Sequence, residues 1–242
     1  MAEYEEWKIY CYDKVTSTND VIKDYCSEPK QKIAVWAKSQ TEGRGRLGRR
    51  WQSLHGNLFF SCALEIDMAD LSGLVILCGL SLCQIIKELN PQNLVQIKWP
   101  NDVLINGAKV SGMLLEKGPN DYIIIGIGVN IVNYPQGKDI IYKTTSLQHE
   151  NIIISPENLL KCFISKFNAN KNLWQRCGNN EKLFASWLKF AKGIGEKLLV
   201  RQNNMEICGI FQGIDTNGCL LLENEQGVCH IRAGDVFYTE EN

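Results

Sequence analysis

Hydrophobic and polar positions along residues 1–131 predict a series of strands interrupted by one long buried helix. Short apolar or alternating runs bounded by polar turns are typical of strands. These runs cover residues 9–12, 33–38, 57–66, 94–99, 102–105, 108–116 and 122–131. The most apolar window covers residues 71–86 and is too short and too interrupted to cross a bilayer, so we expect a buried helix over residues 71–89. Polar residues 16–20 predict the capped start of a short helix ending near Tyr25.

One turn in this region has a specific signature. Asn106 and Gly107 join two of the strand-like runs. Asn-Gly favours a type I′ turn, in which both central residues have positive φ, and this is the strongest short-range signal for a hairpin. We therefore expect an antiparallel meander over residues 94–131.

The pattern changes in the last third of the chain. Ser155-Pro156-Glu157 is typical of a helix start, and apolar residues follow it at helical spacing, as they do again over residues 183–188. From Gly193 onward, five strand-like runs alternate with polar turns, a spacing typical of a small barrel. They cover residues 197–201, 206–214, 219–223, 228–231 and 236–238. We expect an α+β fold: a domain over residues 1–192 with a mixed or antiparallel sheet packed against helices, then a small β-barrel over residues 193–242.

Composition narrows the function classes. The 242 residues contain 26 Lys and Arg against 27 Asp and Glu, a net charge of −1, which lacks the basic background of a general nucleic-acid binder. The acidic start has no signal-peptide pattern, so we expect a cytoplasmic protein that does not enter the membrane. Ten cysteines without a C-x-x-C pair favour reduced thiols that act as small hydrophobic residues; a redox or metal role is the alternative.

The glycine-rich segment Gly43-Arg44-Gly45-Arg46-Leu47-Gly48 matches the G-x-G-x-x-G string of dinucleotide-binding proteins. That fingerprint requires an apolar helix directly after the glycines, with its N-terminus facing a pyrophosphate. Polar residues 49–53 and a strand-like run follow here instead, which disfavours a dinucleotide fold. A protein-kinase loop is also disfavoured, because no H-R-D or D-F-G motif follows.

Charge is the more informative property of this segment. Residues 38–50 contain five cations and one anion, a local charge of +4: Lys38, Arg44, Arg46, Arg49 and Arg50 against Glu42. Two guanidinium groups about 7 Å apart repel by roughly 1 kcal/mol at an effective dielectric constant near 40. We therefore expect a bound anion to be the missing partner of these arginines, and the loop to become ordered when it binds. A solvated basic loop is the alternative.

A second polar cluster is Lys98-Trp99-Pro100-Asn101-Asp102. Pro100 ends a strand, so Asp102 lies at a corner where its carboxylate is suited to a Mg²⁺ ion that also binds triphosphate oxygens. An Asx turn is the equal alternative for Asp102. Taken alone, Lys109 is most simply a solvated lysine beside a turn, whereas Gly112 allows a ligand or backbone to approach closely.

Taken together, these motifs resemble the catalytic domain of biotin protein ligases. The resemblance rests on Gly43-Arg44-Gly45-Arg46-x-Gly48-Arg49-x-Trp51, Lys98-Trp99-Pro100-Asn101-Asp102 and Lys109-Val110-x-Gly112-x-Leu114-x-Glu116, in that order. The C-terminal segment is similar to the SH3-like barrel of the same family. The resemblance implies that a biotin carboxylate attacks the α-phosphate of ATP to give biotinyl-5′-adenylate, after which a carrier-protein lysine attacks the acyl carbon. No enzyme nucleophile is needed.

The resemblance also assigns roles to individual residues. The catalytic cations would be Lys109, Arg46 and Arg44. Biotin would contact Ser17, Thr18, Asn19, Gln40, Arg44, Gly45, Arg46, Lys109 and Gly112. ATP would contact Arg46, Arg49, Trp51, Asn101, Asp102 and Asn130, with Asp102 as the Mg²⁺ ligand. Trp51 has a plain alternative as a core anchor.

The same resemblance sets the expected ligands and partners. ATP with Mg²⁺ and biotin would be substrates, with no tightly bound prosthetic group, and a biotin carboxyl carrier protein would supply the acceptor lysine. A homodimer is compatible with it. Eight residues precede the first expected strand, so we expect no DNA-binding helix-turn-helix and no DNA partner. Two alternatives stay open: a lipoate or octanoate transferase of related fold, and a non-enzymatic RNA-binding protein.

Overall fold

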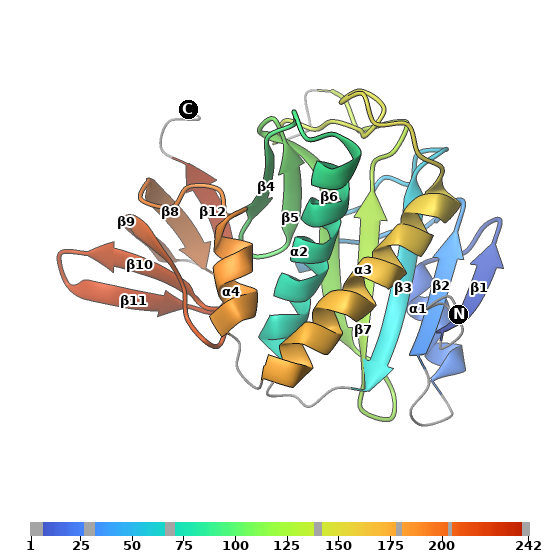
Figure 1. Ribbon diagram of the computed structural model, residues 1–242, viewed down its shortest axis with the longest axis horizontal. Coiled ribbons are helices and arrows are strands. Elements are labelled where there is room, and N and C mark those ends of the chain that lie inside the picture. The colour runs from blue at the N-terminus through green and yellow to red at the C-terminus, as the bar shows by residue number, and fades with distance from the viewer. Residues whose placement is uncertain are drawn as a thin grey trace.

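The computed structural model describes residues 7–26, 32–65, 71–137, 142–177, 181–202 and 205–238. Within these residues a seven-stranded mixed sheet with two long helices is followed by a five-stranded antiparallel sheet (Figure 1). The expected α+β class is therefore confirmed.

The larger sheet contains the predicted meander. Its strands in spatial order are β1 (Trp7–Tyr12), β2 (Lys32–Ala37), β3 (Leu58–Glu65), β7 (Tyr122–Val129), β6 (Ala108–Lys117), β5 (Asp102–Ile105) and β4 (Val95–Lys98). Strands β4 to β7 pair antiparallel in sequence order, and β1 pairs parallel with β2. Asn106 and Gly107 have φ values of 50° and 79°, as the hairpin signature requires.

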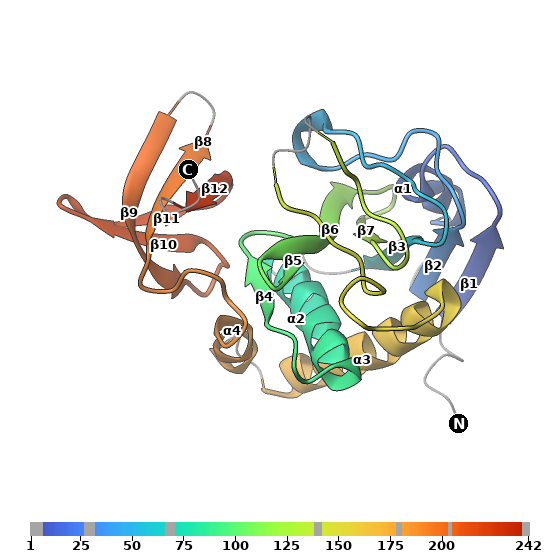
Figure 2. The ribbon, with the colours of Figure 1, turned by 90° about the horizontal axis from the view of Figure 1, so that it is seen from above.

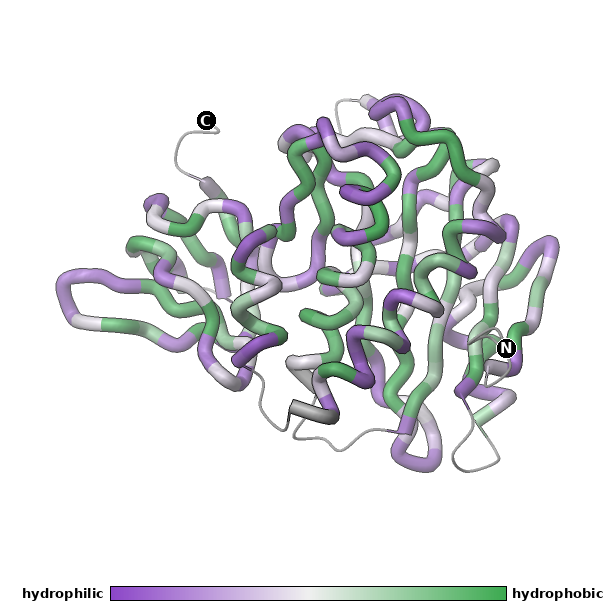
Figure 3. Tube along the Cα trace, viewed as in Figure 1, coloured by the Kyte–Doolittle hydropathy of each residue, from purple (hydrophilic) through white to green (hydrophobic). Residues whose placement is uncertain are grey.

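Successive side chains along the central strands point to opposite faces of the sheet, and both faces are apolar. Ala34, Cys62 and Ile125 face helices α2 (Leu71–Leu89) and α3 (Pro156–Cys177) as part of the main core. Val35 and Ile124 belong to a smaller cluster on the other face, beside α1 (Thr18–Val21) and the 3-10 turn η1 (Ile22–Tyr25). Figure 2 shows α2 and α3 on one side of the sheet and α1 on the other. Hydrophobic residues accordingly follow the central strands and α2 in Figure 3.

The two predicted helix starts differ in how they are capped. At α3, Ser155 Oγ accepts a hydrogen bond of 3.2 Å from the Asn158 backbone N–H, as expected. At α1, the predicted cap by polar side chains is wrong: Ser17 precedes the helix, but its side chain makes no capping bond. Ser17, Thr18 and Asn19 are instead buried. The physical reason is a competing use for polar side chains here, since those of Thr18 and Asn19 form tertiary hydrogen bonds.

The C-terminal sheet is attached close to the residue 98–102 corner. Its strands in spatial order are β11 (Gly227–Ile231), β10 (Leu220–Asn224), β9 (Met205–Ile214), β8 (Lys197–Gln202) and β12 (Asp235–Tyr238). The pairings of these described strands form an open order, so closure into a barrel stays a prediction. The preceding linker, after α4 (Glu181–Leu188), pairs with the free edge of β4: Ile97 N–H donates to Phe190 O at 2.7 Å, and Lys192 N–H donates to Ile97 O at 2.9 Å.

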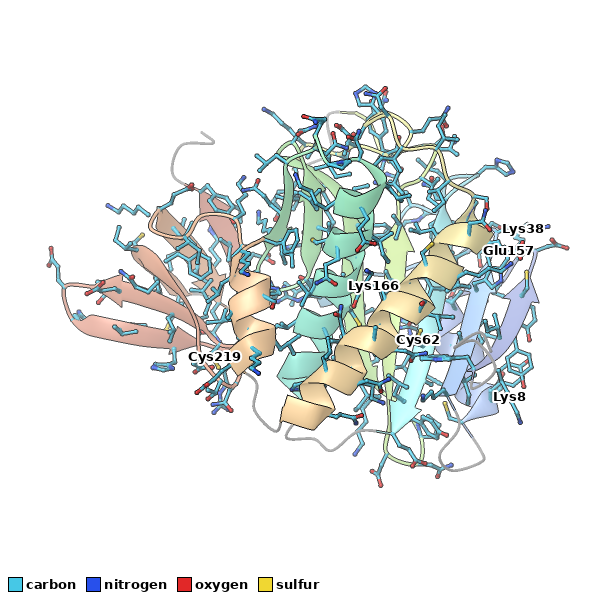
Figure 4. The ribbon with its side chains drawn as sticks, in the orientation of Figure 1. Lys8, Lys38, Cys62, Glu157, Lys166 and Cys219 are labelled. Atoms are coloured by element: carbon cyan, nitrogen blue, oxygen red, sulfur yellow. The ribbon has the colours of Figure 1, made fainter. Side chains whose placement is uncertain are left out.

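The nine cysteines whose side chains the structure describes are free thiols, and four of them are buried in apolar surroundings on β3, in α2 and beside η1. Cys62 is one of these; it lies on β3, which α3 covers (Figure 4). Burial raises the pKa of the Cys62 thiol, so it behaves as a small hydrophobic residue. Among the described residues, no helix is long and apolar enough to cross a membrane.

Candidate active site

A cavity of about 410 Å³ opens on the sheet face opposite α2 and α3. Its wall includes Gly126 and Gly128, which share the β7 face of Ile124. The structure brings every sequence-predicted site residue to this one cavity. They are Ser17, Thr18, Asn19, Gln40, Arg44, Gly45, Arg46, Arg49, Trp51, Asn101, Asp102, Lys109, Gly112 and Asn130.

The arginine loop, residues 43–50, is a small hairpin over this cavity. Arg44 and Arg50 form an antiparallel bridge, and the Gly45 N–H donates to Arg49 O at 2.7 Å. A 3-10 turn, η2 (Arg46–Gly48), forms the tip. Backbone bonds therefore give the loop a defined shape in this structure; its ordering by a ligand stays a prediction.

The expectation that these arginines lack protein partners is wrong for two of them. Arg44 donates to both oxygens of Asp20 at 2.7 and 2.8 Å, and to both oxygens of Glu116 at 3.0 and 2.9 Å. Arg49 is paired with Asp235 of β12. The hydrogen bond from Arg44 lowers the pKa of Asp20 to about 2. The fold thus supplies carboxylates from distant segments, which the local charge count could not include.

Arg46 differs from Arg44 and Arg49 because it is a partly buried cation with no carboxylate partner among the described residues. Its guanidinium donates to Asn101 Oδ1 at 3.1 Å and to Gly234 O at 3.3 Å, and within the described residues it has no ion pair with a carboxylate. Burial lowers the pKa of Arg46, because the charged form loses solvation there. A desolvated guanidinium bound only by neutral oxygens is a strong binding site for an anion.

A second cation lies near the Trp51 indole. Lys109 Nζ is 2.7 Å from Asp102 Oδ1 and 5.5 Å from the centroid of the Trp51 ring. Both Lys109 and Asp102 are largely shielded from solvent, which strengthens their interaction. The solvated-lysine alternative for Lys109 is therefore wrong.

The donor set around Asp102 fits a metal ion that arrives with phosphates. No group of three or more His, Cys, Asp or Glu residues is positioned to hold a metal among the residues that the structure describes. Mg²⁺, however, is often held by one or two carboxylates together with substrate phosphates and water, and a single Asp102 carboxylate suits that mode.

Two paired glycines make room for Trp51. Gly112 on β6 lies opposite Gly128 on β7. A Cβ atom on Gly128 would lie 2.4 Å from the indole ring, and one on Gly112 would lie 3.1 Å from it. The indole therefore lies directly against the sheet backbone and forms part of the cavity wall. The alternative, in which Trp51 only anchors the hydrophobic core, does not describe this position.

Buried polar atoms on this wall lack partners. Trp51 Nε1 and Asn130 Oδ1 are buried without a hydrogen bond in the described part of the protein. Leaving such atoms unsatisfied costs about 1–3 kcal/mol each. One is a donor and the other an acceptor, so a ligand with both kinds of group would satisfy them.

A connected polar network includes three residues of the cavity wall, Thr18, Asn19 and Gln40. Gln40 Oε1 accepts from the Thr18 backbone N–H at 2.9 Å, and Ser61 Oγ lies 2.8 Å from Thr18 Oγ1 and 2.6 Å from Asn19 Oδ1. Asn19 Nδ2 donates to Glu116 Oε2 at 2.8 Å. This part of the wall offers hydrogen bonds rather than charge to a ligand.

Sequence reasoning missed several residues of the site. The network residues Asp20 and Ser61 carry no motif signal, and Asp235 lies 186 residues from its partner Arg49. Tyr142 also lines the cavity, and Lys98 Nζ lies 4.4 Å from the centroid of its ring. Glu116 ends the motif that begins at Lys109, and this is the one sequence signal that points to it.

Comparison with known proteins bears on what this cavity does. The biotin/lipoate A/B protein ligase family matches residues 10–130, and the biotin protein ligase C terminal domain matches residues 193–238. The biotin–[acetyl-CoA-carboxylase] ligase of Paracoccus denitrificans is 34% identical over 218 residues, which cover 84% of this chain and 89% of that protein. The chain belongs to the biotin/lipoate A/B protein ligase family.

Further relatives in this family cover most of the chain. The bifunctional ligase/repressor BirA of Salmonella typhimurium is 32% identical over 219 residues, 87% of this chain and 68% of that protein. The structure of the biotin protein ligase from Aquifex aeolicus in complex with biotin and ATP superposes with a TM-score of 0.83 at 26% identity. That match covers 95% of this chain and 97% of the other. Both sheets therefore belong to the shared fold.

Proposed function

We propose that the protein is a biotin protein ligase that uses ATP to attach biotin to a lysine of a carrier protein. Biotin's carboxylate oxygen attacks the α-phosphorus of ATP and pyrophosphate leaves. The carrier lysine then attacks the acyl carbon of the adenylate, a new amide bond forms and AMP leaves. The observation that carries this proposal is that hydrogen-bonding residues and a cationic centre line one cavity in a chain of this family.

Charge neutralisation is the main contribution that we assign to the protein. Arg46 and Lys109 would hold the carboxylate and the α-phosphate together and stabilise the charge that develops between them. Lys109 is paired with Asp102 in this structure. Asp102 would hold the Mg²⁺ ion that arrives with ATP, which would supply positive charge to the phosphates, and Lys109 would then face the reacting oxygens.

The remaining residue assignments follow the family resemblance, and these residues all line the cavity. Ser17, Thr18, Asn19 and Gln40 would bind the urea ring of biotin, whereas Trp51 and Asn130, with their orphaned polar atoms, would bind the nucleotide. Arg44, Gly45 and Gly112 would shape the wall between them. The acceptor partner is a biotin carboxyl carrier protein. The ligase itself would be cytoplasmic, in keeping with the free thiols of its described cysteines.

The test is mass spectrometry of a purified biotin carrier domain after incubation with this protein, biotin, ATP and Mg²⁺. We expect the mass increase of one biotin on one lysine, together with biotin-dependent release of pyrophosphate. Lipoate in place of biotin is the matched control and should give no release. Release with lipoate and none with biotin would overturn the proposal in favour of the lipoate alternative.

A further inference from the structure

Glu116 does not line the cavity, but it binds two residues that do, Arg44 and Asn19. Its carboxylate is one-quarter exposed and lies between two partners. Oε2 accepts from Arg44 Nη2 at 2.9 Å and from Asn19 Nδ2 at 2.8 Å, while Oε1 accepts from Arg44 Nε at 3.0 Å. Burial raises the pKa of Glu116, but the hydrogen bonds from Arg44 and Asn19 outweigh this and leave it below its ordinary value. The carboxylate is therefore ionised at neutral pH.

An ionised carboxylate decides which way the Asn19 amide points. It can only accept hydrogen bonds, so it must face the NH₂ group of Asn19. The other neighbour, Ser61, is indifferent, because a hydroxyl can donate to an amide oxygen or accept from an amide nitrogen. Of these two partners, only Glu116 distinguishes the two ends of the amide.

The fixed amide presents an acceptor at the cavity wall. Asn19 Oδ1 lies directly over Gly126, where a Cβ atom would be 2.3 Å from it, and both residues line the cavity. Ser61 occupies one lone pair of this oxygen. The second lone pair is available to a ligand that offers an N–H group.

We propose that Glu116 is a specificity-determining positioning residue, which orients Asn19 so that the cavity selects a head group with an N–H donor. This inference rests on the proposed function and deepens it. The cyclic urea of biotin has two N–H donors, whereas the dithiolane ring of lipoate has none. A site built to pair with a donor rejects an analogue that lacks it, because the buried acceptor is left unsatisfied. Glu116 thus separates the two substrate classes of the family.

The test combines a charge-neutral variant with a modified substrate. Glu116→Gln keeps the size of the side chain, but glutamine can face either end of the Asn19 amide, so the orientation is no longer imposed. The substrates are biotin and its two mono-N-methylated urea derivatives, in each of which one N–H donor is missing. Biotin-dependent pyrophosphate release gives KM and kcat for each.

For the wild-type protein we expect one of the two methylated derivatives to have a KM at least about tenfold above that of biotin. In E116Q, the KM for biotin should rise about tenfold while kcat at saturating biotin changes less than threefold. The penalty, which is the KM for that methylated derivative divided by the KM for biotin, should fall to about twofold. A merely structural role would not change the ratio between two substrates.

Asp20→Asn is the matched control. The Asp20 carboxylate also binds Arg44 but makes no hydrogen bond to the Asn19 side-chain amide in the described structure, so D20N should keep the full penalty against the methylated derivative. Glu206→Gln, an exposed carboxylate on β9, should leave all constants unchanged. Thermal unfolding confirms that each variant is folded; if E116Q is not, Glu116→Ala, which removes the carboxylate, replaces it with the same expected result.

The outcomes separate this inference from the proposed function. An unchanged penalty in the folded Glu116 variant, or its loss in D20N as well, would overturn the role of Glu116. Equal KM values for biotin and both methylated derivatives in the wild type would also overturn it. A wild-type protein that releases no pyrophosphate with biotin would instead refute the proposed function.

Discussion

At the residue scale, the arginines of one loop have different tasks because the fold pairs them differently. Arg44 uses Nε and both terminal nitrogens of its guanidinium on Asp20 and Glu116. Arg46, in contrast, contacts only neutral oxygens among the described residues. A charge that has no carboxylate in direct contact gains most from an incoming anion. Arg46, rather than Arg44, should therefore carry the binding of the reacting anions.

We predict that Arg46→Gln lowers the rate of adenylate formation by about a hundredfold, the usual effect of removing one charge-stabilising donor. Single-turnover pyrophosphate release measures this rate. Arg201→Gln, which removes an exposed arginine paired with Glu206 on the C-terminal sheet, is the control and should change the rate less than twofold. Adenylation by R46Q within threefold of the wild type would contradict the prediction.

The Arg44 clamp also predicts how stability responds to acid. The pKa of Asp20 is lowered to about 2 by the hydrogen bond from Arg44, against 3.8 for an unperturbed group. A lowered native pKa stabilises the fold above about pH 4, and this contribution is lost as the pH falls towards 2. We expect the thermal midpoint of the wild type to exceed that of D20N at pH 5, and this difference to shrink between pH 4 and 2. A constant difference would show that the charge of Asp20 is not responsible.

At this scale the sequence predicts interactions between neighbouring residues but not those between residues that are distant in the chain. Asn106-Gly107 could be predicted because a tight turn is decided by its own residues. The partners of Arg44 and Arg49 could not, since Glu116 and Asp235 lie 72 and 186 residues away. The charge count therefore identified an anion-binding segment but assigned too many free cations to it.

At the element scale, strands β6 and β7 form a flat backbone surface for an aromatic side chain. Gly112 and Gly128 are opposite each other in the register, and Trp51 lies against both. Strand bounds followed the hydrophobic pattern closely because alternation decides which face is buried. The contact with Trp51 could not be predicted, because it joins a loop to strands that are distant in the sequence.

We predict that Gly128→Ala displaces the Trp51 indole, since the added methyl would lie 2.4 Å from the ring. Such overpacking costs about 1–3 kcal/mol. The rate of adenylation at low ATP concentration should therefore fall about tenfold, and tryptophan fluorescence should change. Gly79→Ala in α2 is the control: its methyl would have ordinary contacts of 3.5 Å or more, so activity should be retained. Full activity in G128A would contradict the proposed position of Trp51.

At the scale of the whole molecule, the C-terminal sheet helps to form the cavity. Its residues 234–236 line the wall, and the linker extends the β4 edge of the larger sheet. Trp99 Nε1 donates to Gly218 O at 3.0 Å, which adds a contact between the two sheets beside the residue 98–102 corner. Two separate sequence patterns predicted the two sheets, but the contacts between them depend on the assembled fold.

The pair between Arg49 and Asp235 connects the arginine loop to this second sheet, so it should limit the opening of the loop. A partly exposed pair of this kind contributes at most about 1 kcal/mol, which corresponds to an approximately fivefold change in the open population. We predict that Asp235→Asn speeds tryptic cleavage after Arg46, Arg49 or Arg50 by up to about fivefold. Biotin and ATP together should restore protection, because bound anions replace the lost carboxylate as partners of the loop. Asp121→Asn in the exposed β6–β7 turn should leave the cleavage rate unchanged, and equal rates in D235N and the wild type would mean that the second sheet does not restrain the loop.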